Sequence, residues 1–120
     1  SVNELQARVR ALLRRCHGVA TPVLTYRELS FDPATRTASI SGHALQLSLH
    51  ELSVLEVLVR RFGRPVSKEQ LVEQIYTYDK EVSHNAIEVY VHRLRKKIGT
   101  TGLLVRTHYG RGYALDYVEP

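Results

Sequence analysis

Residues 85–97, NAIEVYVHRLRKK, constrain the fold more than any other stretch, because they predict one helix with two dissimilar faces. Apolar residues recur at steps of four, three and four along one side, which is the pattern of a helix that buries one stripe against a core. The members of this stripe are Ile87, Val91, Leu94 and Ile98. On a 3.6-residue wheel the opposite side is polar, with Arg95 and Lys97 on its flanks. That side carries Asn85, Glu88, Val89, His92, Arg93 and Lys96.

The outward side of this helix is basic and poorly balanced in charge. A solvated helix face usually mixes acids and bases, often as Glu–Lys pairs four residues apart. Here Glu88 is the only acid between residues 83 and 115, against six Lys and Arg residues. Several of the outward side chains can form hydrogen bonds with the edges of bases. The combination is typical of a helix that lies in the major groove of DNA.

The composition narrows the class of protein. A chain of 120 residues with 43% hydrophobic residues is expected to form one globular domain, with at most a small appendage. Its formal net charge of +5 favours an anionic partner, with nucleic acid ahead of a membrane surface. Cys16 is the only cysteine, so no intrachain disulfide is possible and a cytoplasmic location fits. No apolar run approaches the roughly 18–20 residues that span a bilayer.

The N-terminal part of the chain suggests a piece of a longer protein. The sequence contains no Met and starts at Ser1, which we interpret as the mark of an excised fragment. Residues 2–16 predict a short amphipathic helix whose apolar stripe is expected to pack on a body outside this chain. Residues 17–23, HGVATPV, have no periodicity and are predicted to be a linker.

The next part predicts β-structure followed by helices. Four short β segments are expected, separated by turn signals at Asp32-Pro33 and Ser41-Gly42. Their predicted bounds are Leu24–Arg27, Glu28–Phe31, Arg36–Ser41 and Ala44–Leu47. Two capping boxes, Ser48 with Glu51 and Ser67 with Gln70, then predict two helices that end near Gly63 and Ile75. The residues expected to be buried in these two helices are Leu52, Leu55, Val59, Phe62, Leu71, Val72 and Ile75.

The C-terminal part completes the predicted architecture. A polar loop at 76–82 leads into the basic helix at 83–98, and the last unit, LLVRTHYGRGYALDY, predicts a β-hairpin that turns at residues 109–112. A helix-turn-helix followed by a hairpin is a winged helix, in which the second helix of the pair enters the major groove. The predicted fold class is therefore α+β: a winged helix-turn-helix with an N-terminal antiparallel sheet, three helices and a C-terminal hairpin wing.

Three stretches resemble the C-terminal effector domain of OmpR/PhoB-type two-component response regulators. They are SLHELSVLEVLVRRFGRPVSKEQLVEQIY, SHNAIEVYVHRLRKKIG and VRTHYGRGYAL, so the resemblance covers about residues 23–118. The run NAIEVYV with His92 is most similar to the branch that includes the QseB, PmrA and TctD regulators. LQARVRALLRR, within residues 2–16, resembles the final helix of a receiver domain. We therefore expect a receiver tail helix at 1–16, a linker at 17–23 and the effector domain at 24–118.

The resemblance implies a four-stranded N-terminal sheet and the partners of a bacterial phosphorelay. It implies binding to promoter DNA as a tandem homodimer on direct repeats, without a cofactor. A sensor kinase would act only through the receiver domain, whose phospho-acceptor Asp is absent from this sequence. The loop after the second helix is expected to contact RNA polymerase. The residues assigned to that loop are Tyr76, Thr77, Tyr78, Asp79, Lys80 and Glu81.

Four outward residues of the basic helix are candidates for contacts with base edges: Arg93, Val89, His92 and Asn85. The planar guanidinium of Arg93 can bond bidentately to guanine, which is worth roughly 1–3 kcal/mol of discrimination; the alternative is a phosphate contact at the edge of the groove. Val89 could meet a thymine methyl group or simply be exposed. Asn85 could read adenine, although capping of the helix is the favoured interpretation.

A second set of residues is expected to hold phosphates, which supplies affinity and register without sequence information. This set comprises Tyr90, Arg95, Lys96, Lys97, Arg106 and Thr107. In the wing, many family members carry VRGxGYR, with an Arg that can enter the minor groove. Tyr109 stands at the position of that Arg, so we expect Arg111 to make the minor-groove or phosphate contact instead.

Several residues and motifs bear on alternatives to DNA binding. The Glu88 carboxylate would repel the phosphates of DNA. It is therefore expected either to accept a hydrogen bond from cytosine or, as the favoured interpretation, to pair with His92 or Arg95. His84 and His92 lie eight residues apart, too far for shared metal chelation, and no nucleophile motif points to an enzyme.

The alternative to DNA is a winged-helix interaction module whose basic helix docks on an acidic protein. RNA binding would usually require more stacking aromatics than Tyr26 and Phe31 on the sheet.

Overall fold

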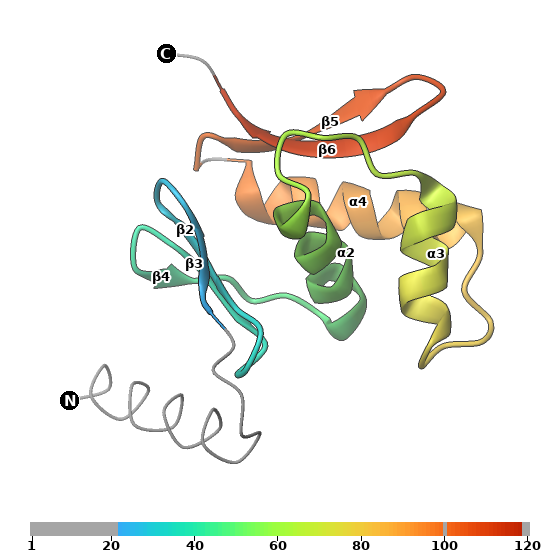
Figure 1. Ribbon diagram of the computed structural model, residues 1–120, viewed down its shortest axis with the longest axis horizontal. Coiled ribbons are helices and arrows are strands. Elements are labelled where there is room, and N and C mark those ends of the chain that lie inside the picture. Colours follow the sequence, from blue (N-terminus) through green and yellow to red (C-terminus); the bar gives the residue numbers. More distant parts are fainter. Residues whose placement is uncertain (1–21, 100, 119–120) are drawn as a thin grey trace. The chain divides into compact units, whose positions relative to one another are not determined.

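The computed structural model describes residues 22–99 and 101–118 (Figure 1). The predicted helix at 2–16 and most of the predicted linker lie outside these residues. The Cα positions group into two compact units, one up to Ala44 and one from Leu45 onward. The assignment of 24–118 to one effector domain stays a prediction.

The first unit holds a four-stranded antiparallel sheet in the order β1-β2-β3-β4, as predicted. Its strands are β1 (Leu24–Tyr26), β2 (Leu29–Asp32), β3 (Thr37–Ile40) and β4 (His43–Ala44). Leu29 lies opposite Ile40 and Phe31 opposite Ala38 in the β2–β3 register. Because side chains alternate between the two faces of a strand, these four residues share one face, and all four are buried.

The predicted bounds of the fourth strand were wrong. Ala44–Leu47 was expected, but β4 comprises only His43 and Ala44. Ser41 and Gly42 both have positive φ, 52° and 81°, and form the two-residue loop of a tight hairpin. A loop this short places His43 directly opposite Ile40, so pairing begins earlier than the apolar pattern suggested.

The second unit contains three helices whose starts follow from the sequence. They are α2 (Leu49–Arg60), α3 (Lys68–Tyr76) and α4 (His84–Ile98). Both predicted capping boxes are present: the Ser48 hydroxyl accepts from the Glu51 amide at 3.2 Å, and the Ser67 hydroxyl accepts from the Gln70 amide at 3.1 Å. The capped ends explain why these helices begin at the predicted positions.

The buried side of α2 is broader than predicted. Leu55 and Val59 are buried as expected, whereas Leu52 and Phe62 are only half-buried. Val54 and Leu58, which the predicted stripe omitted, are fully buried instead. The cause is that α2 packs against α3, α4 and a strand of the hairpin, so a single stripe underestimates its contacts. In α3, Leu71 and Ile75 are buried and Val72 is half-buried.

The C-terminal hairpin forms as predicted and is extended by a third segment. Strands β5 (Leu103–His108) and β6 (Gly112–Tyr117) pair antiparallel, and the hairpin runs alongside α4 (Figure 1). Val66, between α2 and α3, exchanges two backbone hydrogen bonds with Tyr113 at 2.7 and 2.9 Å. The Gly63 amide also donates to the Leu115 carbonyl at 3.0 Å. The connection between the first two helices thus fixes the outer edge of β6.

Glu51 links the start of α2 to the end of α4. Its carboxylate accepts from the Ser48 backbone amide and from the Lys97 ammonium, and the Glu51 side chain is buried. Burial acts to raise the pKa of Glu51, but the hydrogen bonds from Lys97 and Ser48 outweigh it and hold the pKa below its usual 4.5.

Glu51→Gln should keep the capping box, since Gln serves equally well at this position, but remove the charge that faces Lys97. Because the folded-state pKa is the lower one, ionised Glu51 stabilises the fold above the unfolded-state pKa and stops doing so as pH falls through the folded-state pKa. We expect the variant to lose about 1 kcal/mol of unfolding free energy at neutral pH. Urea titrations from pH 7 to pH 3 should show the difference from wild type shrinking; a constant difference would contradict this account.

Gly112 lies where the hairpin approaches the backbone at Val66. Its φ is +114°, and a Cβ added there would lie 1.9 Å from the Val66 carbonyl oxygen. Gly112→Ala should therefore break the bridge and cost roughly 2–4 kcal/mol of unfolding free energy, combining backbone strain with lost hydrogen bonds. Gly110→Ala is the matched control, because Gly110 has φ +77° but open space around it, so only about 1 kcal/mol is expected. Equal losses in chemical denaturation would argue against the close approach.

Candidate nucleic-acid interface

The two predicted faces of α4 are confirmed. Ile87, Val91, Leu94 and Ile98 are buried, and Ser83 caps the helix by accepting from the Ala86 amide at 3.2 Å. The preference for Asn85 as the capping residue was wrong, because Ser83 already fills that position two residues earlier. Asn85 instead lies exposed in the first turn, where its amide group is available to a ligand.

The outward face of α4 presents polar groups that make few internal contacts. Asn85, Val89, His92, Arg93 and Lys96 are all exposed. Within residues 22–99 and 101–118, no hydrogen bond or ion pair occupies the side chains of Asn85, His92, Arg93 or Lys96. These groups therefore lose no internal partner when they bind something else.

Glu88 pairs with a residue that the sequence did not indicate. His92 or Arg95 was expected, but the Lys68 ammonium at the start of α3 donates to the Glu88 carboxylate. The bond lowers the pKa of Glu88 and raises that of Lys68. A separation of twenty residues carries no periodic signal, so only packing of α3 on α4 brings the two together. The pair offsets the one acid on the basic face.

An open groove of about 480 Å³ lies between the start of α3, Glu88 and the hairpin. Its lining from the hairpin runs from Thr107 to Tyr113, and its lining from α3 comprises Ser67, Lys68 and Glu69. The charged residues of the lining are Lys68 and Arg111 and the acids Glu69 and Glu88.

Arg95 and Thr107 join α4 to the hairpin. Arg95 donates through Nε and Nη2 to the Val105 carbonyl at 3.1 and 2.9 Å, and Nη2 also donates to the Thr107 hydroxyl at 2.7 Å. The guanidinium carbon of Arg95 lies 5.7 Å from the centre of the Tyr113 ring. Both residues were predicted to contact phosphates, and the structure shows that each already has an internal partner.

Two further predicted phosphate contacts are also paired. Lys97 binds Glu51, and Arg106 Nε donates to the Asp116 carboxylate at 3.2 Å across the hairpin. Lys96 is exposed on α4. Tyr90 is half-buried, and burial, followed by the charge of Asp79, raises the pKa of its phenol.

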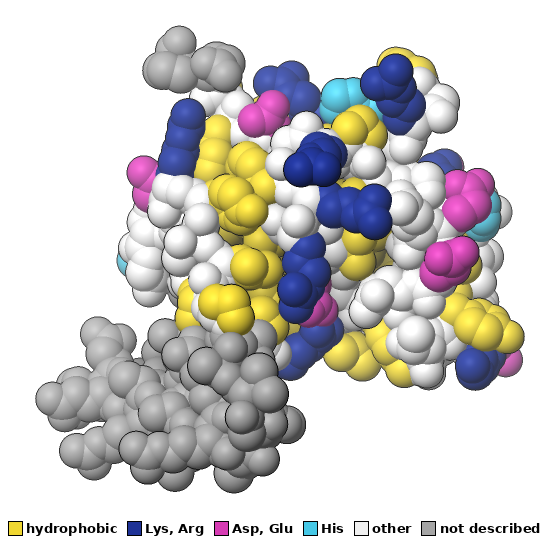
Figure 2. All heavy atoms as spheres, viewed as in Figure 1, with side chains coloured by type: hydrophobic (Ala, Val, Ile, Leu, Met, Phe, Trp, Pro, Cys, Tyr) yellow, Lys and Arg dark blue, Asp and Glu magenta, His cyan; other side chains and the backbone are white. Residues whose placement is uncertain are grey.

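The wing turn projects the remaining predicted contacts into solvent. Tyr109 is 96% exposed, and the neighbouring Arg111 is exposed too. The Arg111 amide donates to the His108 carbonyl at 2.9 Å, which closes the turn. Figure 2 shows basic and histidine side chains together at the hairpin end, and a row of Lys and Arg side chains over α2 and its connection to α3. The exposed basic residues at the end of α2 and in this connection are Arg60, Arg61 and Arg64, which no sequence pattern indicated.

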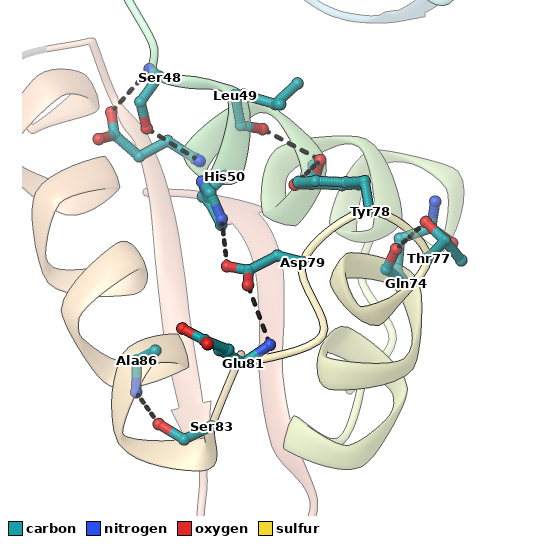
Figure 3. Close-up of polar contacts among 12 residues, drawn as sticks. Ser48, Leu49, His50, Gln74, Thr77, Tyr78, Asp79, Glu81, Ser83 and Ala86 are labelled. Carbon is teal, nitrogen blue, oxygen red and sulfur yellow. Dashed lines mark hydrogen bonds and ion pairs between the residues drawn. The ribbon is translucent and has the colours of Figure 1, made fainter.

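The loop between α3 and α4 is held against α2 (Figure 3). The Tyr78 hydroxyl lies 2.7 Å from the Ser53 hydroxyl, and Asp79 Oδ2 lies 2.9 Å from His50 Nε2. The Glu81 amide donates to Asp79 Oδ1 at 3.0 Å. The bond with His50, followed by the one from Glu81, lowers the pKa of Asp79. His50 and Ser53 were missed because partners 29 and 25 residues away leave no local pattern.

The predicted loop residues divide into two groups. Thr77 donates to the Gln74 carbonyl at 2.8 Å and ends α3, so it serves the helix. The Lys80 ammonium lies 4.3 Å from the centre of the Tyr76 ring, and Tyr76 is 49% exposed. Lys80 and Glu81 are exposed as well.

The described residues contain no group of three or more His, Cys, Asp or Glu side chains arranged to hold a metal ion. None of the helices in the same residues is long and apolar enough to cross a membrane.

Comparison with known proteins agrees with this architecture. Residues 42–115 match the family described as transcriptional regulatory protein, C terminal. The chain belongs to this family. It is 44% identical over 119 residues to the response regulator protein PmrA of Pseudomonas aeruginosa, covering 99% of this chain and 53% of PmrA. It is also 41% identical over 112 residues to the transcriptional regulatory protein QseB of Escherichia coli O157:H7, covering 93% of this chain and 50% of QseB.

A solved structure supports the fold independently. The crystal structure of the DNA binding domain of CpxR from E. coli aligns with 82% of this chain and 100% of its own, with a TM-score of 0.68 and 27% identity. The predicted resemblance to OmpR/PhoB-type regulators and the predicted winged-helix fold are confirmed. The chain spans about half the length of the curated relatives that it matches.

Arg95→Lys tests the join between α4 and the hairpin. One ammonium cannot reproduce the guanidinium contacts with both the Val105 carbonyl and the Thr107 hydroxyl. We expect a loss of about 1–2 kcal/mol of unfolding free energy. Arg93→Lys makes the same chemical change at an exposed site and should stay within about 0.5 kcal/mol of wild type. Urea denaturation of both variants would decide, and equal stability of the two would remove the structural role from Arg95.

Proposed function

We propose that this chain is the effector part of a two-component response regulator and binds double-stranded promoter DNA in a sequence-specific manner. The observation that carries the proposal is the division of α4: one stripe is buried, and the opposite face offers basic and amide side chains without internal partners. A helix of this kind following α3 suits insertion into the major groove. The names of PmrA, QseB and CpxR add support, because they describe response regulators, a transcriptional regulator and a DNA binding domain.

In this proposal Arg93, Val89, His92 and Asn85 read the bases. Arg93 would bond to guanine, and Val89 would meet a thymine methyl group. Asn85 is assigned to a contact with adenine, because Ser83 caps the helix and leaves the Asn85 amide group available. The exposed position of all four residues allows each side chain to reach a groove without rearranging the core.

Phosphate contacts are assigned in two ranks. Lys96 has no internal partner among the described residues and is expected to contribute most, with the half-buried Tyr90 beside it. Arg95, Lys97, Arg106 and Thr107 already have internal partners and would contact phosphates only through their remaining N–H or O–H groups, so each should contribute less. In the wing, Arg111 and Tyr109 are proposed to meet the minor groove or its phosphates.

The oligomeric state on DNA, the protein partners and the cellular location are proposed from the family. Two copies would bind direct repeats as a tandem homodimer, and the α3–α4 loop would contact RNA polymerase. A sensor kinase would act through the receiver domain of the response regulator. We place the regulator in the bacterial cytoplasm, where its promoter DNA lies.

The competing function is a protein-interaction module that docks its basic helix on an acidic partner. The cores of protein interfaces are depleted in Lys and enriched in large aromatic residues. Among the described residues of α4, the aromatic side chain is Tyr90, which is half-buried against His50, and the exposed apolar one is Val89. This composition favours DNA.

The decisive experiment is selection of binding sites from random duplex DNA, followed by titration of the winners against salt. The proposal predicts enrichment of direct repeats spaced about one helical turn apart, with a steep linear fall of log affinity against log salt. Absence of any enriched motif would reject sequence-specific binding by this chain. Enrichment of single half-sites would retain DNA binding and reject tandem pairing without the receiver.

Arg93→Ala should lower affinity for the selected site by roughly tenfold or more, while affinity for random DNA falls much less, because a bidentate guanine contact is lost. Lys96→Ala is the matched control: loss of a phosphate contact should weaken both kinds of DNA similarly and reduce the salt slope by about one. Fluorescence anisotropy at several salt concentrations measures both effects. If Arg93→Ala weakened selected and random DNA equally, Arg93 would be a phosphate contact.

A further inference from the structure

His50 occupies a position that the DNA interface does not explain. It lies in the first turn of α2, and its side chain is 29% exposed. Its Nε2 meets Asp79 Oδ2 at 2.9 Å, and its ring lies 5.4 Å from that of Tyr78 and 4.8 Å from that of Tyr90. The His50 side chain therefore extends from α2 and contacts both the α3–α4 loop and α4. Figure 3 shows His50 directed at Asp79 across the space between α2 and the loop.

Asp79 forms hydrogen bonds with α2, with α3 and within the α3–α4 loop. Its Oδ2 faces His50, and its Oδ1 accepts from the Glu81 amide at 3.0 Å. Its backbone amide donates to the Ile75 carbonyl at 2.9 Å, which continues the end of α3. The carboxylate thus ties the next residues of the loop to α2 through a single imidazole. Removal of the imidazole would leave the Asp79 carboxylate bonded only within its own loop, to the Glu81 amide.

The hydrogen bonds to α2 divide the residues of the α3–α4 loop into an inward group and an outward group. Asp79 and the Tyr78 hydroxyl bond to α2, whereas Tyr76 remains 49% exposed with Lys80 stacked 4.3 Å from its ring. The outward group offers an aromatic ring and one ammonium group. Such a surface suits a protein partner with an apolar patch next to an acidic side chain.

We propose that His50 is a positioning residue, whose hydrogen bond to Asp79 holds the α3–α4 loop in the shape that presents Tyr76 and Lys80 to a protein partner. The identity of that partner as RNA polymerase rests on the proposed function. His50 touches neither the DNA bases nor the partner in this scheme; it acts through Asp79. The contact of its ring with Tyr90 places the same residue beside a proposed phosphate contact.

The test uses two amides of different length at position 50. In His50→Gln the side-chain nitrogen reaches the position of Nε2 and can still donate to Asp79, whereas in His50→Asn it is too short to do so. Both variants lose the ring contacts with Tyr78 and Tyr90. His43→Asn is the matched control, since His43 is exposed in β4 and carries no proposed role.

The first measurement follows the loop itself by amide hydrogen exchange and backbone NMR of the DNA-bound chain. His50→Asn should lower the protection of the Glu81 amide roughly tenfold, the loss expected from one hydrogen bond to a charged group, and shift the resonances of 77–82. His50→Gln should restore both towards wild type, and His43→Asn should change neither. Wild-type protection in His50→Asn, or equal loss in the Gln and Asn variants, would overturn the proposal.

The second measurement records recruitment of purified RNA polymerase to the selected DNA site. With the DNA site saturated by each variant, His50→Asn should reduce recruitment severalfold, and His50→Gln should recover it. Tyr76→Ala should reduce recruitment without affecting protection of the Glu81 amide, which separates the contact surface from its support. Failure of the wild-type chain to recruit polymerase would reject the proposed partner, while the exchange data would still judge the role of His50. Full recruitment by His50→Asn, despite a loosened loop, would reject the link from positioning to partner.

Discussion

Burial of one stripe of α4 is the constraint on which the rest of the structure depends. With Ile87, Val91, Leu94 and Ile98 packed inward, a 3.6-residue helix has no freedom about where its other side chains point. Arg93 and Asn85 must face outward, and no loop flexibility can change that. The hairpin and α3 are then placed by what packs around the same helix. A reading surface built on a rigid helix is more accurately placed than one built on a loop.

Side chains that the sequence suggested for DNA are partly used to hold the surface together. Arg95 joins α4 to β5, and Lys97 joins α4 to α2 through Glu51. Lys68 covers the charge of Glu88 from α3. Each of these bases connects α4 to a neighbouring element. Loss of any one is therefore expected to disturb DNA binding through geometry as well as through charge.

The parts of this fold that could be predicted are those whose causes are local. The capping boxes at Ser48 and Ser67 and the apolar stripe of α4 act within one or two helical turns, and all three were found from spacing alone. The partner of Glu88 and the role of His50 depend on residues 20 and 29 positions away. No periodicity encodes such contacts. The wrong assignment of Asn85 as the cap of α4 has a local cause. Both Ser83 and Asn85 are residue types that can cap a helix, and it is the Ser83 hydroxyl that accepts from the Ala86 amide.

The distinction between paired and unpaired bases changes what the net charge of +5 means for DNA binding. Counterion release depends on phosphates that are neutralised, so a base already paired with a carboxylate contributes less than its charge suggests. On α4 the unpaired bases are Arg93 and Lys96 among the described residues, with Arg111 in the wing. Nonspecific affinity should therefore be lower than a count of Lys and Arg implies. Specific affinity should fall by a similar electrostatic amount, since phosphates are contacted at either kind of site. The preference for the right site over the wrong one therefore rests on the base contacts and not on the number of Lys and Arg residues.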